Sequence, residues 1–161
     1  MQKKEKLIIL VEDEKVLANL IGLKLKQAGY RVVIEEDGTK GLNSILTTKP
    51  DLVLLDVVLP GMNGFEILKK LQEVHMLPEL PIIIISNSGQ PIEIEDAFDL
   101  GVRDYLIKVN FDSNEVLEKV NQLFIKIEQE RQTKKDNGYS CPSCQLFNGK
   151  IHFPFPGQFC G

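Results

Sequence analysis

Five residues in the middle of the chain, Leu52 to Asp56, constrain the fold more than any other stretch. Four consecutive apolar side chains precede Asp56, and Pro60 and Gly61 follow shortly afterwards. A short run that is apolar on both faces is typical of a strand in the middle of a parallel sheet with helices on each side. Pro60 and Gly61 mark its end. Because open α/β sheets bind ligands at the carboxyl ends of their strands, Asp56 is a candidate site residue.

Apolar strand-length runs and helical patterns alternate along most of the chain. Four further strands are expected, at 7–11, 30–34, 82–86 and 104–108. Helices are expected between the strands, at about 16–29, 37–46, 65–74 and 91–100. The last helix is the most regular, because a capping box from Asp112 to Glu115 precedes an apolar stripe that ends at Ile127. This order predicts an α/β fold with a five-stranded, doubly wound parallel sheet.

Composition divides the chain into three parts. Residues 6–127 form the predicted sheet domain, residues 128–138 a charged helix extension or linker, and residues 139–161 a short Cys-rich C-terminal extension. A formal net charge of −4 gives no electrostatic reason to expect nucleic acid. No apolar run approaches the roughly 20 residues that a bilayer span requires, and the N-terminus lacks a signal-peptide pattern. We therefore expect a cytoplasmic protein with no membrane attachment and no direct nucleic-acid partner.

Polar side chains stand at the ends of four predicted strands: Glu12 and Asp13 after the first, Asp56 at the third, Ser86 at the fourth and Lys108 at the fifth. The carboxyl ends of parallel strands meet at one edge, so we expect these groups to converge. Clustered carboxylates repel one another unless a cation lies among them, and oxygen ligands suit Mg²⁺. Lysine and serine can hold phosphoryl oxygens. The pattern predicts magnesium-dependent phosphoryl transfer with Asp56 as the nucleophile.

These residues match a known family. Over about residues 6–127 the sequence resembles the receiver domain of bacterial response regulators of the two-component and chemotaxis type. The resemblance rests on the motifs Leu10-Val11-Glu12-Asp13-Glu14, Leu54-Leu55-Asp56, Leu59-Pro60-Gly61-Met62-Asn63-Gly64, Ile85-Ser86, Asp104-Tyr105 and Lys108. It implies a flavodoxin-like sheet with the strand order 2-1-3-4-5.

The resemblance also implies a role for the acidic residues. Asp56 would be the phosphoacceptor for a histidine kinase or a histidine phosphotransfer protein. Asp13 and Asp56 would bind Mg²⁺, Glu12 would do so directly or through water, and the Val58 carbonyl would complete the shell. A protein of this kind is a signalling phosphoacceptor that takes part in its own phosphotransfer and dephosphorylation, and we do not expect it to be an enzyme in the wider sense.

Three further residues would convert phosphorylation into a signal. By resemblance, Lys108 would contact the phosphoryl group and Ser86 would turn inward to hydrogen-bond it. Tyr105 would change rotamer as the surface between the fourth and fifth strands repacks for a downstream protein target. Adding roughly 1.5 to 2 negative charges at one residue is a recognised way to bias a two-state loop.

Two positions depart from the family pattern. Val109 stands where the family usually has a proline after the lysine, often with a cis bond. Because a non-proline cis bond costs about 2.5–4 kcal/mol, we expect a trans bond and a different loop here. Asn87 stands where a small residue is common, and its larger side chain could slow access to Asp56. Both departures leave the chemistry intact but bear on the size of the switch.

The C-terminal extension carries all three cysteines of the chain. Cys141 and Cys144 form a Cys-x-x-Cys knuckle, and Cys160 lies near the end of the chain. The three cysteines resemble a pair of zinc knuckles that lacks one cysteine ligand, and His152 could replace that ligand. The alternative is an extension with free thiols that binds no metal.

Two other functions compete with phosphorylation-controlled signalling. The first is a receiver-like interaction module that no longer uses phosphate, which the presence of Asp13, Asp56 and Lys108 disfavours. The second is a phosphatase of the haloacid dehalogenase class, whose usual second acid is replaced here by Val58. Fewer than 35 residues follow Ile127 and they lack a helix-turn-helix pattern, so we expect output through protein partners or the Cys-rich extension.

Overall fold

The computed structural model describes residues 5–77, 79–87, 89–110 and 112–136, together with two short strands at 145–147 and 150–152. Side chains are described for residues 5–77, 79–87, 89–109 and 112–134. The chain divides into two compact units, residues 1–118 and 119–161, and the division falls inside the last helix.

The first unit contains a five-stranded sheet and the helices that connect its strands. The strands are β1 (Leu7–Val11), β2 (Arg31–Glu35), β3 (Leu52–Asp56), β4 (Ile82–Ser86) and β5 (Asp104–Ile107). The helices are α1 (Lys15–Gln27), α2 (Gly38–Thr48), α3 (Gly64–Glu73), α4 (Pro91–Asp99) and the start of α5 (Ser113–Asp136), with a 3₁₀ turn η1 (Lys108–Asn110) after β5.

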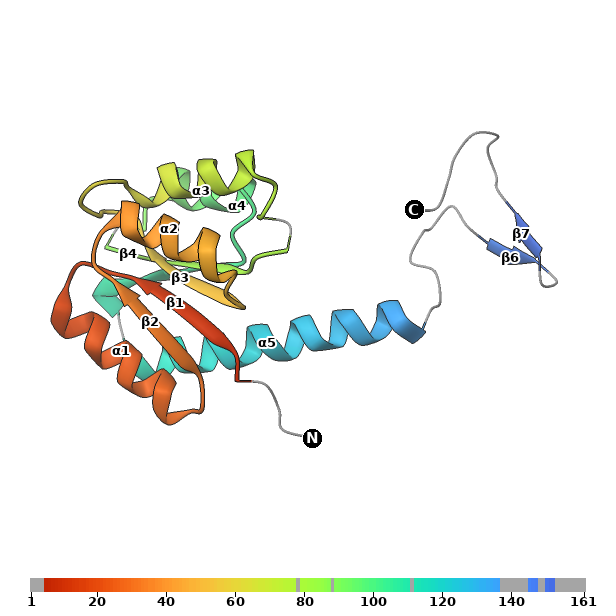
Figure 1. Cartoon of the computed structure of the whole chain (residues 1–161), viewed down its shortest axis with the longest axis horizontal. Helices are drawn as coiled ribbons and strands as arrows, with labels where there is room; N and C mark the ends of the chain where they lie inside the picture. Colours follow the sequence, from red (N-terminus) through yellow and green to blue (C-terminus); the bar gives the residue numbers. More distant parts are fainter. Residues whose placement is uncertain are drawn as a thin grey trace. The chain divides into compact units, whose positions relative to one another are not determined.

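All neighbouring strands of this sheet are parallel, in the order β2-β1-β3-β4-β5. The predicted flavodoxin-like, doubly wound fold is therefore confirmed. Helix α1 lies on one face of the sheet, and α2, α3 and α4 lie on the other (Figure 1). The central strand β3 lies between β1 and β4, so Asp56 at its carboxyl end lies beside the residues that follow β1 and those that follow β4.

The central strands bury both faces, as their uninterrupted apolar sequences predict. Alternate strand residues point to the layer formed by α2, α3 and α4: Ile9, Val11, Val53, Leu55, Ile82 and Ile84. They form one core with the helix residues Ile45, Leu68, Leu71 and Ala97. The residues between them point to the α1 face and are equally buried: Ile8, Leu10, Leu52, Leu54, Ile83 and Ile85. Each such side chain contributes about 1.5–3 kcal/mol by leaving water, which holds β3 rigidly in place.

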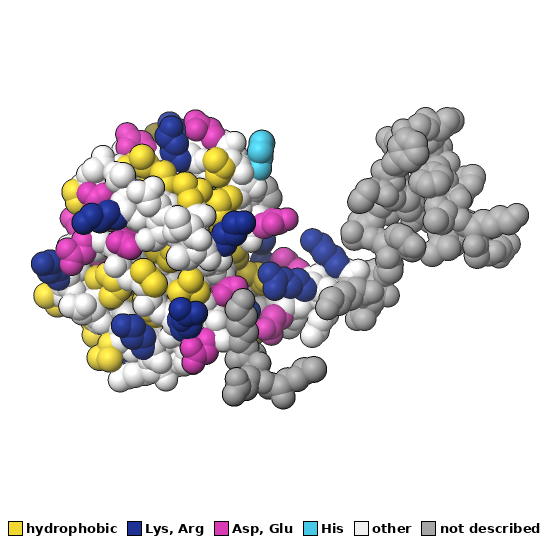
Figure 2. All heavy atoms as spheres, viewed as in Figure 1, with side chains coloured by type: hydrophobic (Ala, Val, Ile, Leu, Met, Phe, Trp, Pro, Cys, Tyr) yellow, Lys and Arg dark blue, Asp and Glu magenta, His cyan; other side chains and the backbone are white. Residues whose placement is uncertain are grey.

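The apolar residues of helix α1 are not all buried. Its buried positions include Ala18, Ile21 and Leu25, whereas Val16 and Leu23 are exposed although they are apolar. On the face in Figure 2, acidic and basic side chains are interspersed, and hydrophobic side chains reach the surface between them.

The second unit begins at Lys119 within α5. The helix continues to Asp136, so residues 128–136 of the charged segment are a helix extension. Val120, Phe124 and Ile127 of the predicted apolar stripe are buried. Strands β6 (Gln145–Phe147) and β7 (Lys150–His152) pair in an antiparallel ladder. Among the described helices, none combines the length and apolar character that a bilayer span requires.

Two helix N-termini clamp the loop between β3 and α3. Gly38, the first residue of α2, donates its N–H to the Pro60 carbonyl at 3.0 Å. A Cβ atom at Gly38 would lie 1.7 Å from the Met62 carbonyl oxygen. A Cβ atom at Gly64, the first residue of α3, would lie 2.5 Å from the Asp56 carbonyl oxygen. Because glycine has no Cβ atom, both helix N-termini can pack closely against the backbone around Asp56 and the loop that follows it.

We predict that Gly38→Ala lowers the free energy of unfolding by about 1–3 kcal/mol, because the added methyl group overlaps a backbone carbonyl that cannot rotate away. Urea unfolding would measure the change. Asn43→Ala, at an exposed position of the same helix, should stay within about 0.5 kcal/mol of the parent protein and serves as the control. Equal stability of the two variants would contradict the predicted clamp.

Candidate functional site

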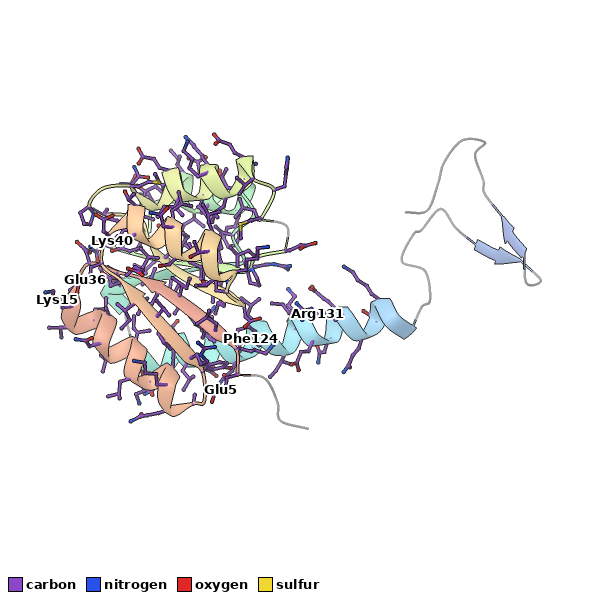
Figure 3. The ribbon with its side chains drawn as sticks, in the orientation of Figure 1. Glu5, Lys15, Glu36, Lys40, Phe124 and Arg131 are labelled. Atoms are coloured by element: carbon purple, nitrogen blue, oxygen red, sulfur yellow. The ribbon has the colours of Figure 1, made fainter. Side chains whose placement is uncertain are left out.

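Charged side chains gather at the carboxyl end of the sheet: Glu12 and Asp13 after β1, Asp56 at the end of β3 and Lys108 after β5. In Figure 3, Lys15 and Glu36 mark this end of the sheet, and Glu5 marks the opposite end. The parallel topology thus brings together residues that lie up to 96 positions apart along the chain (from Glu12 to Lys108).

The three acids can share one ion. Carboxylate oxygens of Glu12, Asp13 and Asp56 lie within 4.8 Å of one another. Glu12 and Asp56 are only 1% and 4% exposed, whereas Asp13 is exposed and borders the solvent. Of the three acids, Asp13 is thus the one in contact with solvent.

Lys108 bridges the two buried carboxylates. Its Nζ lies 2.8 Å from Asp56 Oδ2, to which it donates a hydrogen bond, and 2.7 Å from Glu12 Oε2. All three side chains are almost fully buried. Burial alone would lower the pKa of Lys108, but its contacts with Asp56 and Glu12 raise that pKa above its ordinary value. The lysine is therefore charged at neutral pH.

Glu12 remains short of partners despite this ion pair. Its Oε1 accepts a hydrogen bond from the Glu14 N–H at 3.1 Å. Its Oε2 is buried and contacts the Lys108 ammonium at 2.7 Å, in an ion pair that falls outside hydrogen-bond geometry within the described residues. Burial raises the pKa of Glu12 to about 7, the Lys108 contact opposes the rise, and the Asp56 charge adds to it. A further cation would relieve this shortage.

The donor set fits Mg²⁺. The three acids offer only oxygen ligands, which Mg²⁺ prefers. The turn after β3 also folds Val58 back onto Asp56, whose Oδ1 accepts a hydrogen bond from the Val58 N–H at 3.3 Å. Gly64 holds this turn by donating its N–H to the Val57 carbonyl at 2.8 Å.

Ser86 and Tyr105 form the neighbouring part of the site. Ser86 is buried at the end of β4, directly after Ile85, which pairs with Asp56. Tyr105 is half-buried on β5 and shares a side-chain hydrogen bond with Ser86. Burial raises the pKa of the Tyr105 hydroxyl, and the Ser86 hydrogen bond opposes the rise. The tyrosine hydroxyl is thus linked to the strand next to Asp56.

The two departures from the family pattern lie at the rim. No cis peptide bond occurs among the described residues, so the expected trans bond before Val109 is confirmed. Val109 is 79% exposed within the 3₁₀ turn η1. Asn87 is also exposed.

Sequence reasoning missed the residues that hold the loop after Asp56. Asn63 and Glu66 form a capping box at the start of α3, with the Glu66 N–H donating to Asn63 Oδ1 at 2.9 Å. The Asn-x-x-Glu spacing is a recognised signal for such a cap. The predicted box at α5 differs in detail, because the Asp112 carboxylate accepts from the Asn114 N–H at 2.9 Å.

The predicted zinc ligands cannot be placed. Cys141, Cys144 and Cys160 lie outside the described residues. His152 ends β7, but its side chain is outside them as well. Zinc binding by the C-terminal extension stays a prediction.

Comparison with known proteins adds a family assignment to this geometry. The family model described as response regulator receiver domain matches residues 8–121. A solved CheY-like response regulator receiver domain protein from Methanospirillum hungatei JF-1 has a TM-score of 0.72 at 25% identity, covering 79% of this chain and 99% of that one.

Two curated relatives are named as regulators of transcription. Transcriptional regulatory protein DltR of Streptococcus agalactiae is 39% identical over 113 residues, or 70% of this chain and 49% of that protein. The DNA-binding dual master transcriptional regulator RpaA of Synechocystis is 31% identical over 128 residues, or 80% of this chain and 53% of that protein. The chain spans about half the length of these relatives, and their names give no support to the expectation of no nucleic-acid partner.

We predict that Lys108→Met lowers the free energy of unfolding of the metal-free protein by about 3 kcal/mol, because the two buried carboxylates lose the one cationic side chain that contacts them among the described residues. Saturating Mg²⁺ should restore a larger share of stability in this variant than in the parent protein, since the ion then supplies the missing positive charge. Urea unfolding with a chelator and with Mg²⁺ measures both effects. Lys69→Met, an exposed lysine on α3, is the control, and an equal loss in both variants would contradict the prediction.

Proposed function

Because this chain belongs to the response regulator receiver domain family, we propose that it is a phosphorylation-controlled signalling domain. Asp56 accepts a phosphoryl group from the phosphohistidine of a histidine kinase or a histidine phosphotransfer protein. The observation that carries the proposal is the buried contact of Lys108 with Asp56, 2.8 Å long, inside a cluster of three carboxylates. The protein acts as a phosphoacceptor and takes part in its own phosphotransfer.

The transfer step starts at the Asp56 side chain. One Asp56 oxygen attacks the phosphorus atom, the phosphorus–nitrogen bond of the donor histidine breaks, and the bonding electrons return to the imidazole, which takes up a proton. Oδ1 accepts the Val58 N–H and Oδ2 accepts Lys108, so the carboxylate is held in one orientation before the donor arrives. Such preorganisation lowers the barrier because little reorganisation is left for the reaction itself.

Mg²⁺ held by Glu12, Asp13, Asp56 and the Val58 carbonyl would neutralise charge on the phosphoryl oxygens. Lys108 can then exchange its contact with the carboxylate for one with a phosphoryl oxygen, because its ammonium has three donors. Lys108, together with an Mg²⁺ held by the acids, would compensate the negative charge that phosphorylation adds in this largely buried site.

Phosphorylation reaches the surface through Ser86 and Tyr105 in this proposal. Ser86 turns toward the phosphoryl group, and its hydrogen bond with Tyr105 makes the tyrosine respond. The surface near Tyr105 and α4 then repacks and binds a downstream protein target. A cytoplasmic location is part of the same proposal, since it follows from the proposed phosphodonor.

The competing functions have less support. A module that no longer uses phosphate has no need to bury Glu12 and Asp56 with a lysine, since such a cluster costs desolvation energy. A dehalogenase-class phosphatase would need an acid at Val58, whose side chain is apolar and exposed.

We predict that a small acyl phosphate and Mg²⁺ add one phosphoryl group to the protein, measured by intact mass. Asp56→Asn should abolish the adduct, because the amide nitrogen is a poor nucleophile and the charge is lost. Asp99→Asn, at an exposed position of α4, should react as the parent protein does. Absence of an adduct with every donor tested would refute the proposed function.

We predict that Asp13→Asn weakens Mg²⁺ binding by about tenfold or more, because affinity for a hard cation depends on the number of charged oxygen ligands. Calorimetric titration measures the affinity, and the rate of adduct formation should fall in parallel. Glu36→Gln removes an exposed acid at the same end of the sheet and is the matched control. A similar small effect in both variants would show that Asp13 acts only through general electrostatics.

A further inference from the structure

Strand β2 forms one edge of the five-stranded sheet, and among the described residues its outer side pairs with no other strand. Helix α1 lies beside it on one face of the sheet and α2 on the other (Figure 1). Val32, Val33 and Ile34 in its middle are only half-buried, in contrast to the fully buried central strands. An open strand edge is a template for pairing with another chain, so the residues of this edge decide what can pair with it.

The backbone groups on the open side of β2 belong to Val32 and Ile34. On the side of β1, the Arg31 N–H donates to the carbonyl of the residue before β1 at 3.0 Å, and the Glu35 carbonyl accepts the N–H of the residue after β1 at 2.9 Å. Successive residues of a strand turn their N–H and C=O groups to alternate sides, so Arg31, Val33 and Glu35 point toward β1. The N–H and C=O groups of Val32 and Ile34 therefore point away from the sheet.

The sequence Arg-Val-Val-Ile-Glu of β2 is complementary to itself when two copies run antiparallel. With Val33 opposite Val33 of a second copy, Val32 lies opposite Ile34. In a hydrogen-bonded antiparallel pair, the two opposite residues exchange both N–H···O bonds. Two such pairs form, one on each side of Val33, so every outward N–H and C=O of Val32 and Ile34 gains a partner.

Charge complementarity favours the same register. Arg31 lies opposite Glu35 of the second copy at both ends of the paired segment, in a non-hydrogen-bonded pair whose side chains come close together. Both side chains share the face of Val33, which packs against the core on the α2 side of the sheet. The Ser44 hydroxyl of α2 donates to Glu35 Oε1 at 2.6 Å and holds the carboxylate on this face. Opposite charges directly across antiparallel strands stabilise the pairing.

The other edge of the sheet lacks this property, because an antiparallel pair of β5 strands would set Asp104 against Ile107. A simpler role for Arg31 and Glu35 is to keep the β2 edge unpaired, since charged side chains on edge strands oppose association. In that role the sign of each charge is unimportant. In a paired edge, Arg31 and Glu35 must carry opposite charges, and this difference separates the two roles.

We propose that β2 is an interface for a second copy of this chain, in which two β2 strands pair antiparallel about Val33 and join two sheets into one. The copies are related by a two-fold axis, so each presents the same residues to the other. Five residue pairs make a small interface, and we expect a dissociation constant on the order of 100 μM. The interface lies at the opposite edge of the sheet from Tyr105 and forms whether or not Asp56 carries a phosphoryl group.

Sedimentation equilibrium of the whole chain with a reducing agent, from about 10 μM to about 1 mM, measures this association. Arg31→Glu and Glu35→Arg should each weaken self-association about tenfold or more, because each turns two attractive pairs into two repulsive ones. An equimolar mixture of these two variants should associate as strongly as the parent protein, because opposite charges then face each other at both ends. Lys69→Glu makes the same change of charge at an exposed position of α3 and should behave as the parent protein does.

Amide hydrogen exchange followed by NMR tests whether β2 is the contact. At about 1 mM, where roughly four fifths of the chains would be paired, the N–H groups of Val32 and Ile34 should exchange about fivefold more slowly than in dilute protein. The Val33 N–H points toward β1 in either state and should change little. A parent protein that stays monomeric, a dimer without this protection, or a mixture of the charge variants that fails to associate overturns the inference. Circular dichroism shows whether each variant is folded, and if one is not, amide exchange in the parent protein decides.

Discussion

The structure depends on one buried contact, in which the Lys108 ammonium bridges the carboxylates of Asp56 and Glu12 at 2.8 and 2.7 Å. The three groups come from the ends of β3, β1 and β5, and they can meet only if those strands run in the same direction. Burying them is costly in itself, since each charge loses its hydration. The burial of apolar side chains on both faces of β1, β3 and β4 offsets the unfavourable desolvation free energy of this cluster.

Much of this arrangement can be predicted from the sequence, because it follows from two simple patterns. Uninterrupted apolar runs indicated central parallel strands, and polar residues at their ends indicated one shared edge. Convergence of Asp13, Asp56 and Lys108 then requires only the topology, with no knowledge of side-chain conformations. Strand order came from the family resemblance, since the alternation of elements alone leaves several doubly wound orders open.

The parts that escaped prediction depend on close packing between elements. A Cβ atom at Gly38 would overlap the Met62 carbonyl oxygen, and one at Gly64 would overlap the Asp56 carbonyl oxygen, so neither position tolerates a side chain. Such contacts depend on the distance between two helix ends, which no local pattern encodes. Val16 and Leu23 on α1 are exposed although they are apolar, because helical spacing says which residues share a face but not how wide the covered face is.

The Glu12 carboxylate connects the stability of the site with its proposed function. Glu12 is 1% exposed, and its Oε2 contacts the Lys108 ammonium in an ion pair that falls outside hydrogen-bond geometry among the described residues. A fold that minimised its free energy in one state would supply a further donor to this oxygen. In the proposed function a bound cation supplies that partner. The burial that makes the cluster costly without a cation also strengthens its interaction with one, because the local dielectric constant is low.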